Sequence, residues 1–184
     1  MWYNLVTCAY LDVLGLVDEK QKEITLVFYD CRDVAFDDIG ISPRMMEAVE
    51  YHRKEAGMEG EMSHLSDILI WLASRGFKIS MCVDEGRSLE KGVRDFLMKM
   101  KSTNLDNITI MTKGLGYLMH KKALVTPLGI IQGSANLTYS GTGKNEEIIN
   151  YVSFGGSGYK QIQLNISDTF HGSHEWKQPS SVRS

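Results

Sequence analysis

Segments with strand and helix patterns alternate along the first two thirds of this sequence, and this alternation limits the fold more than any other feature. Short apolar runs rich in β-branched residues predict strands, and they fall at 24–29, 77–83 and 107–112. Apolar residues at helical spacing predict helices, and these fall at 42–57, 65–74 and 88–101. The order is typical of an α/β domain with helices packed on a mainly parallel or mixed sheet.

The last third of the sequence predicts antiparallel strands instead. Alternating apolar residues indicate strands at 117–125, 128–132 and 147–154. The first two are joined at Pro127-Leu128-Gly129, which is short enough for a hairpin. A polar loop is expected at 133–145, and a weaker helix at 160–176.

Size and composition indicate one globular domain, residues 1–184, with its core at about 24–176. The 184 residues are 43% apolar and 23% charged, and a domain of this size buries roughly 70% of the surface of its unfolded chain. The 20 Lys and Arg against 23 Asp and Glu give a net charge of −3. No overall basic field therefore attracts nucleic acid, so a polyanion must be held by a local patch.

The cysteines and the N-terminal segment indicate a cytoplasmic protein without a membrane segment. Cys8, Cys31 and Cys82 are odd in number and lack C-x-x-C spacing, so neither a disulfide framework nor a zinc site is expected. The apolar run at 5–17 is interrupted by Asp12 and is too short to span a bilayer.

Three short polar segments of the antiparallel part carry the chemistry. In a strand, His120 and Lys122 share one face, so an imidazole and an ammonium lie together. The turn at 133–136 places Ser134 and Asn136 where backbone N–H groups, a hydroxyl and a carboxamide can converge on an anion. Glu147 begins the next predicted strand and is placed to orient the histidine ring.

The stretch from Tyr117 to Tyr151 resembles the signature of the phospholipase D superfamily, H-x-K-x-x-x-x-D followed by G-S-x-N and a later glutamate. Residues 120–122 match H-x-K, residues 133–136 match G-S-x-N, and Asn145-Glu146-Glu147 resembles the N-x-E of the small bacterial nuclease branch. The resemblance implies a phospholipase D-like mixed sheet with helices on both faces and a single motif in the chain.

One position departs from the pattern, because Pro127 stands where the superfamily has its aspartate. In the superfamily that residue is regarded as supporting the turn more than attacking the substrate. The departure leaves an alternative open, in which the chain is a catalytically degenerate binding or assembly subunit of a DNA-modification or defence system with further protein subunits.

The resemblance also implies a homodimer and a covalent mechanism. Members with two motifs build one site from both, so a chain with one motif is expected to place His120 and Lys122 of two copies about a two-fold axis. One His120 would attack the phosphorus to give a phosphohistidine, and the other would protonate the leaving oxygen. Lys122, Ser134 and Asn136 would hold the phosphate oxygens, with no metal or cofactor required, and Glu147 would fix the tautomer of the histidine.

The resemblance favours nucleic acid, either DNA or RNA, as the substrate, since no apolar membrane-inserting loop is evident and a lipid phosphodiesterase is the least favoured alternative. Basic residues near the motif are expected to contact further phosphates; they are Lys113, Lys121 and Lys144. Glu146 replaces Glu147 if the strand register shifts by one residue.

Two other groups of residues suggest a metal site but are better explained without one. His171 and His174 have the spacing of a ligand pair. An acidic cluster follows the first strand and could serve a two-metal nuclease; it comprises Asp30, Asp33, Asp37 and Asp38. Acidic loops after strands are mostly solvated, so we expect no metal at either place.

Overall fold

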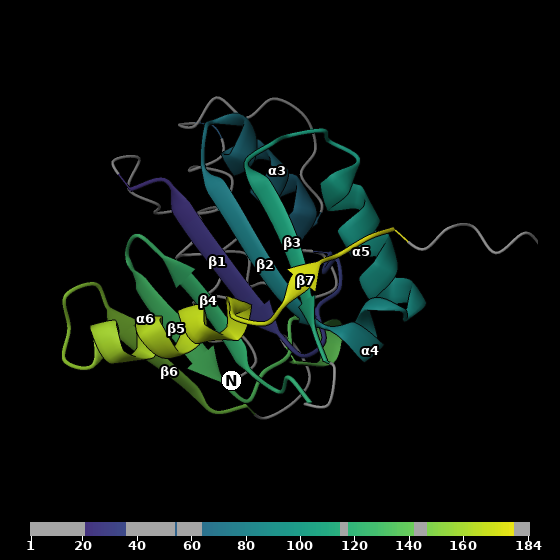
Figure 1. Cartoon of the computed structure of the whole chain (residues 1–184). Helices are drawn as coiled ribbons and strands as arrows, with labels where there is room; N and C mark the ends of the chain where they lie inside the picture. The colour runs from purple at the N-terminus through teal and green to yellow at the C-terminus, as the bar shows by residue number, and fades with distance from the viewer. Residues whose placement is uncertain (1–20, 36–53, 55–63, 115–117, 142–146, 179–184) are drawn as a thin grey trace, which may run out of the picture.

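A computed structural model describes residues 21–35, 54, 64–114, 118–141 and 147–178 of the chain (Figure 1). Its centre is a seven-stranded sheet with the order β6-β5-β4-β1-β2-β3-β7. The strands are β1 (Glu23–Phe28), β2 (Lys78–Asp84), β3 (Ile108–Lys113), β4 (Lys122–Thr126), β5 (Gly129–Gly133), β6 (Ile149–Ser153) and β7 (His174–Glu175).

The sheet is mixed, as the sequence predicts. β1 pairs with β2 and β2 with β3 in parallel, while β4 joins the other side of β1 antiparallel. β4, β5 and β6 continue as antiparallel neighbours. The central strand β1 therefore ends beside the start of β4, since Phe28 is opposite Lys122.

Helices cover both faces of the sheet and bury two separate apolar clusters. On one face, α3 (Leu65–Ser74) and α5 (Lys91–Lys101) pack through Leu69, Phe96 and Leu97 against alternate residues of β1, β2 and β3. On the other face, α6 (Tyr159–Ser167) lies across β4 and β5 and packs against Val125 and Ile130 (Figure 1). The prediction of helices on both faces is confirmed.

The predicted helix at 88–101 is wrong at its start, because two helices occupy this region. A short helix, α4 (Glu85–Ser88), begins directly after β2, and α5 begins at Lys91. Asp84 explains the first helix, because its carboxylate caps the N terminus by accepting the Arg87 backbone N–H at 3.2 Å.

The predicted helix at 160–176 is wrong in its second half. α6 ends at Ser167, a 3₁₀ turn covers Asp168–Phe170, and β7 pairs antiparallel with β3. Gly172, with a φ of +72°, turns the chain there. The backbone N–H of the buried Trp176 then donates to the Ile110 carbonyl, which extends the pairing with β3.

Some predictions fall outside the described part of the chain. Apart from Lys54, which is helical, the predicted helix at 42–57 lies there, as does Cys8. Cys31 and Cys82 are buried free thiols, and burial raises the pKa of Cys82 to about 11. Among the described helices, none has the length and apolar character needed to cross a bilayer.

Candidate active site

His120 and Lys122 lie at the start of β4, beside the end of β1. The predicted strand at 117–125 is wrong here, because β4 begins only at Lys122 and His120 precedes it. The backbone explains this difference: the N–H of Met119 donates to the Asp84 carboxylate at 3.2 Å and not to a neighbouring strand. Strand alternation therefore does not place His120, although the two side chains still meet.

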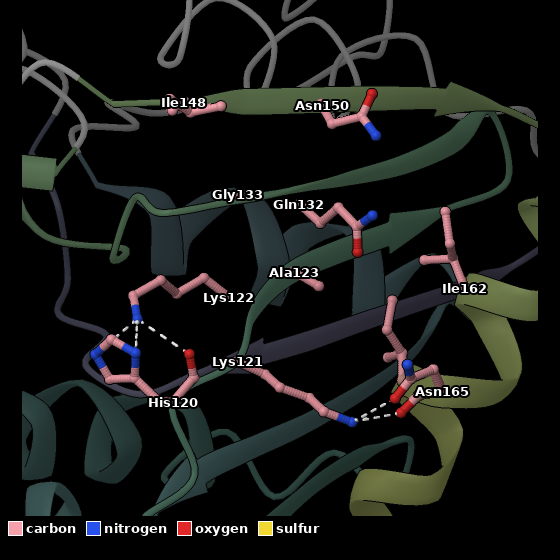
Figure 2. Close-up of a pocket in the computed structure, with 11 residues that line it drawn as sticks. His120, Lys121, Lys122, Ala123, Gln132, Gly133, Ile148, Asn150, Ile162 and Asn165 are labelled. Atoms are coloured by element: carbon pink, nitrogen blue, oxygen red, sulfur yellow. Dashed lines mark hydrogen bonds between the residues drawn. The ribbon is translucent and has the colours of Figure 1, made fainter.

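The Lys122 ammonium contacts the imidazole of His120 directly. Its Nζ lies 3.1 Å from both Nδ1 and Nε2 of the ring and 3.1 Å from the His120 carbonyl oxygen (Figure 2). His120 is exposed, whereas Lys122 is buried, with 6% of its surface accessible. Burial lowers the pKa of Lys122, and the negative charge of Glu147 opposes this shift. The pair thus presents an accessible imidazole beside a fixed ammonium.

Tyr29, the residue after β1, holds this pair from the side and was not among the candidates from the sequence. Its ring centroid lies 4.8 Å from that of His120, and the Lys122 ammonium lies 5.5 Å from the Tyr29 centroid. The Arg87 guanidinium packs against the same ring at 4.6 Å. The only sequence signal was its place at the end of a strand, where side chains of parallel strands commonly form sites.

Asp84 connects the site to the fold. Its buried carboxylate, 6% accessible, accepts the Arg87 N–H through Oδ1 and the Met119 N–H through Oδ2. The backbone immediately before His120 is thereby fixed to the N terminus of α4. Asp84 was not among the candidate residues from the sequence, because Met119 lies 35 residues farther along the chain.

Ser134 and Glu147 form one hydrogen-bonded unit. The Ser134 hydroxyl donates to Glu147 Oε2 and accepts the Ile148 backbone N–H at 3.0 Å. The prediction that Glu147 begins a strand is wrong, because β6 starts at Ile149. Glu147 lies within electrostatic range of Lys122, as the pKa of that lysine indicates, and the structure pairs the carboxylate itself with Ser134.

The loop that carries Asn136 runs along the segment that follows β1. Arg32 N–H donates to the Leu137 carbonyl and Leu137 N–H donates to the Asp30 carbonyl. Asn136 Oδ1 is buried and has no hydrogen-bond partner among the described residues. An unpaired buried oxygen is costly. The donors of this side chain are the N–H groups of its amide nitrogen, so these are the groups that could hold a phosphate oxygen.

A groove of about 460 Å³ opens beside His120 and Lys122 (Figure 2). Its floor is the α6-covered face of β4, β5 and β6, and Ile162 and Asn165 of α6 form one wall. The reacting pair thus lies at one end of a concave surface, which is the usual shape of a ligand site.

The other basic residues proposed for phosphate contact are engaged with the protein. Lys113 donates to the His171 carbonyl at 2.7 Å, and Lys121 donates to the Asn165 carbonyl at 2.6 Å and to Thr169 Oγ1 at 3.0 Å. Both tie α6 and the following turn to the sheet. Lys144 and Glu146 lie outside the described residues.

The residues considered as metal ligands have other partners. Asp30 pairs with Arg32, and Asp33 accepts the Ser66 hydroxyl at 2.7 Å and the Lys99 ammonium at 3.1 Å. His171 Nδ1 faces Asp168 at 3.5 Å, whereas His174 Nε2 lies 3.1 Å from Glu85 Oε1. Within the described ranges, no three His, Cys, Asp or Glu side chains are grouped to hold an ion; Asp37 and Asp38 lie outside those ranges.

Comparison with known proteins gives structural relatives only. No family model matches the sequence, and no curated protein matches it. Among solved structures, Nuc of Salmonella typhimurium, a phospholipase D family member, superposes with a TM-score of 0.60 at 13% identity, covering 93% of this chain and 90% of its own. NucT of Helicobacter pylori gives a TM-score of 0.62 at 12% identity, covering 95% and 92%.

A third structure with the same fold is TrmBL2, an archaeal chromatin protein described with a novel mode of DNA binding. It superposes with a TM-score of 0.55 at 11% identity over 95% of this chain and 51% of its own length. At these identities the likeness shows the fold.

Proposed function

We propose that this chain, which has the phospholipase D fold, is a metal-independent phosphodiesterase that hydrolyses nucleic acid with His120 as its nucleophile. The contact of the Lys122 ammonium with the exposed His120 ring carries the proposal. The exposed ring can reach the phosphorus of a bound diester, and an imidazole nitrogen is a competent nucleophile there. The same ammonium supplies the positive charge that a metal ion supplies at other phosphodiesterase sites.

The reaction proceeds by two displacements at phosphorus. In the first, a ring nitrogen of neutral His120 bonds to phosphorus as the bond to the leaving oxygen breaks, and a protonated histidine gives that oxygen its proton. In the second, the histidine that gave up its proton takes a proton from water, the water oxygen attacks phosphorus, and the bond between phosphorus and the nucleophilic histidine breaks. Lys122, Ser134 and Asn136 stabilise the charge on the other oxygens.

The second histidine in this scheme is His120 of the partner subunit. The chain contains one H-x-K that is followed by G-S-x-N, since the H-x-K at residues 52–54 has no such partner segment, so a homodimer would bring two copies of His120 to one phosphate. Leu118 and Ile148 support such an interface, because they are 69% and 81% exposed and each lies within two residues of a proposed site residue, His120 or Glu147. Exposed apolar side chains of this kind are typical of interaction surfaces.

Nucleic acid is proposed as the substrate because of the folds that match. The neighbours named Nuc and NucT support a nuclease-like phosphodiesterase, and TrmBL2 extends the fold to DNA binding. Both DNA and RNA are candidate substrates. A cytoplasmic location is proposed together with this function, because Cys31 and Cys82 are free thiols and thiols stay reduced in that compartment.

A second candidate function is a non-cleaving subunit, which Pro127 favours. The turn between β4 and β5 nevertheless holds without an aspartate, because Thr126 Oγ1 accepts the Leu128 N–H at 3.2 Å and donates to the Gly129 carbonyl at 3.4 Å. Thr126 is itself buried. This substitute for the carboxylate supports the enzymatic proposal.

An assay with and without His120 tests the proposed function. Purified protein is incubated with plasmid, single-stranded DNA and RNA in EDTA, beside His120→Ala and the control His171→Ala, whose side chain is 86% exposed and does not line the groove. We expect the wild type and the control to cleave at least one substrate and His120→Ala to cleave none. Equal inactivity of all three proteins on every substrate would favour the binding subunit.

The oligomeric state is tested in the same preparation. Light scattering at micromolar concentration is expected to give the mass of two chains of 20.7 kDa. A strict monomer that still cleaves would contradict the shared site. Release of choline from lipid vesicles without any nucleic-acid cleavage would contradict the substrate class.

A further inference from the structure

The groove beside His120 has a polar floor built from three adjacent strands. Ala123 of β4 is opposite Gln132 of β5, and Gln132 is opposite Asn150 of β6. Figure 2 shows the Gln132 and Asn150 side chains on the same side of the sheet. Ala123 has only a methyl side chain, so the floor is open next to His120. The carboxamides of Gln132 and Asn150 border the floor farther from His120.

The far wall of the groove is fixed to the segment that carries His120. Lys121 follows His120 directly, and its ammonium donates to the Asn165 carbonyl at 2.6 Å and to Asn165 Oδ1 at 2.9 Å. One row farther along the sheet, Val125 and Ile130 are buried under α6. The α6 wall of the groove is therefore held in place by hydrogen bonds from Lys121 and by apolar packing of α6 on the sheet.

The chemistry of the floor suits a neutral group with both donors and acceptors. Within the described part of the chain, the side chains of Gln132 and Asn150 have no hydrogen-bond partner in the protein. Each carboxamide offers two donors and an acceptor. The described lining contains Lys121 and Lys122 but no carboxylate, so it is compatible with a phosphate at one end and with a polar uncharged group over the floor.

We propose that this groove is a base-binding subsite for an unpaired nucleotide next to the scissile phosphate, with Gln132 and Asn150 hydrogen-bonded to the base edge. This inference rests on the proposed function and narrows its substrate class to single-stranded nucleic acid. In a duplex the edges used for pairing are occupied, and a base must be unstacked and turned out to enter a pocket. A single strand presents those edges without that cost.

The volume of the groove agrees with one occupant of this size. Its roughly 460 Å³ falls in the range of about 300–1,000 Å³ that small-molecule sites occupy. No aromatic side chain lines it in the described residues, so recognition depends on the carboxamides more than on stacking. We therefore expect a preference among bases, in contrast to platforms that stack every base alike.

Binding of labelled DNA tests the subsite independently of catalysis. Fluorescence anisotropy compares a single-stranded oligonucleotide with the same sequence in a duplex, using His120→Ala protein to prevent cleavage. The test variant adds Gln132→Ala and Asn150→Ala, and the control adds Gln163→Ala, an exposed α6 residue outside the groove. Gln132 is partly exposed and Asn150 is exposed, so the substitutions are expected to leave folding intact.

We expect the test variant to lose about tenfold in the ratio of single-strand to duplex affinity, which is what two lost hydrogen bonds amount to. The control is expected to keep the ratio of the parent protein. An unchanged ratio in the test variant, or a parent that binds the duplex more tightly, would overturn the subsite.

A substrate without a base separates failure of the proposed function from failure of the subsite. Wild-type protein and His120→Ala are compared on bis(p-nitrophenyl) phosphate in EDTA. Equal inactivity of the two on this diester overturns His120 chemistry, whereas the affinity ratio alone decides for or against the groove.

Discussion

Replacement of Asp84 by asparagine tests whether one buried carboxylate connects the fold to the reacting histidine. The two carboxylate oxygens each accept a backbone N–H, from Arg87 and from Met119, at 3.2 Å. An asparagine provides one acceptor oxygen and turns an amide group toward the other N–H. One buried donor is then left unpaired, which costs about 1–3 kcal/mol of folding free energy.

Urea unfolding of Asp84→Asn measures this cost. We expect the free energy of unfolding to fall by about 2 kcal/mol with an unchanged m-value. Activity is expected to fall further than the unfolded fraction explains, since the bond from Met119 N–H fixes the backbone next to His120. Asp106→Asn is the matched control, because Asp106 is exposed. A loss below about 0.5 kcal/mol, the usual range of a surface substitution, would refute the reasoning.

Three further predictions concern the same region. Tyr29→Leu is expected to reduce kcat/KM about tenfold and Tyr29→Phe much less, because contact of the ring with His120 and Lys122 contributes about 1 kcal/mol to transition-state stabilisation. Equal losses in the two variants in steady-state assays would assign the effect to the hydroxyl. Gly133→Ala is expected to lower the free energy of unfolding by about 1–3 kcal/mol in thermal melts, since its Cβ would lie 2.0 Å from the Ile148 carbonyl oxygen. Gly92→Ala is the control and is expected to be neutral or stabilising, because its Cβ would meet only the flexible Arg32 side chain. Similar melts for the two variants would contradict this. Burial lowers the folded-state pKa of Lys122, so its charge destabilises the folded state below that pKa, and this destabilisation disappears as pH rises toward the unfolded-state pKa of about 10.4. Urea titrations should therefore show the wild type gaining stability relative to Lys122→Met as pH rises. A parallel pH dependence of the two proteins would contradict the lowered pKa of Lys122.

The alternation of apolar runs was sufficient to predict most of the sheet. The strands at β1, β2 and β3 and the helix at Leu65–Ser74 lie where periodicity placed them. Their residues are buried on one or both faces, so local pattern and tertiary burial agree. The single-domain assignment stays a prediction.

Periodicity failed where a side chain, not a neighbouring strand, satisfies the backbone. Asp84 caps α4 and accepts the Met119 N–H, so a short helix follows β2 directly and β4 begins only at Lys122, after His120. Gly172 and the pairing of β7 with β3 replaced the last turns of a predicted helix. Such contacts join residues far apart in sequence, and no local window contains them.

The candidate site was predicted in part. The spacing of His120 and Lys122 predicted their contact, although the strand argument for it was wrong. Tyr29 was missed because its partners are Arg87 on α4 and His120 at β4, which only the sheet order brings together. The roles of Asn136 and Glu147 in catalysis stay predictions.

Trapping of the covalent intermediate tests the central claim most directly. Protein mixed with an oligonucleotide that carries a labelled phosphate at the cleavage site is quenched under alkaline conditions during turnover, and the modified peptide is identified by mass spectrometry. Our account predicts an acid-labile phosphoryl group on His120 that is missing from His120→Ala. Cleavage without any adduct on this histidine, or with the label on another residue, would contradict it.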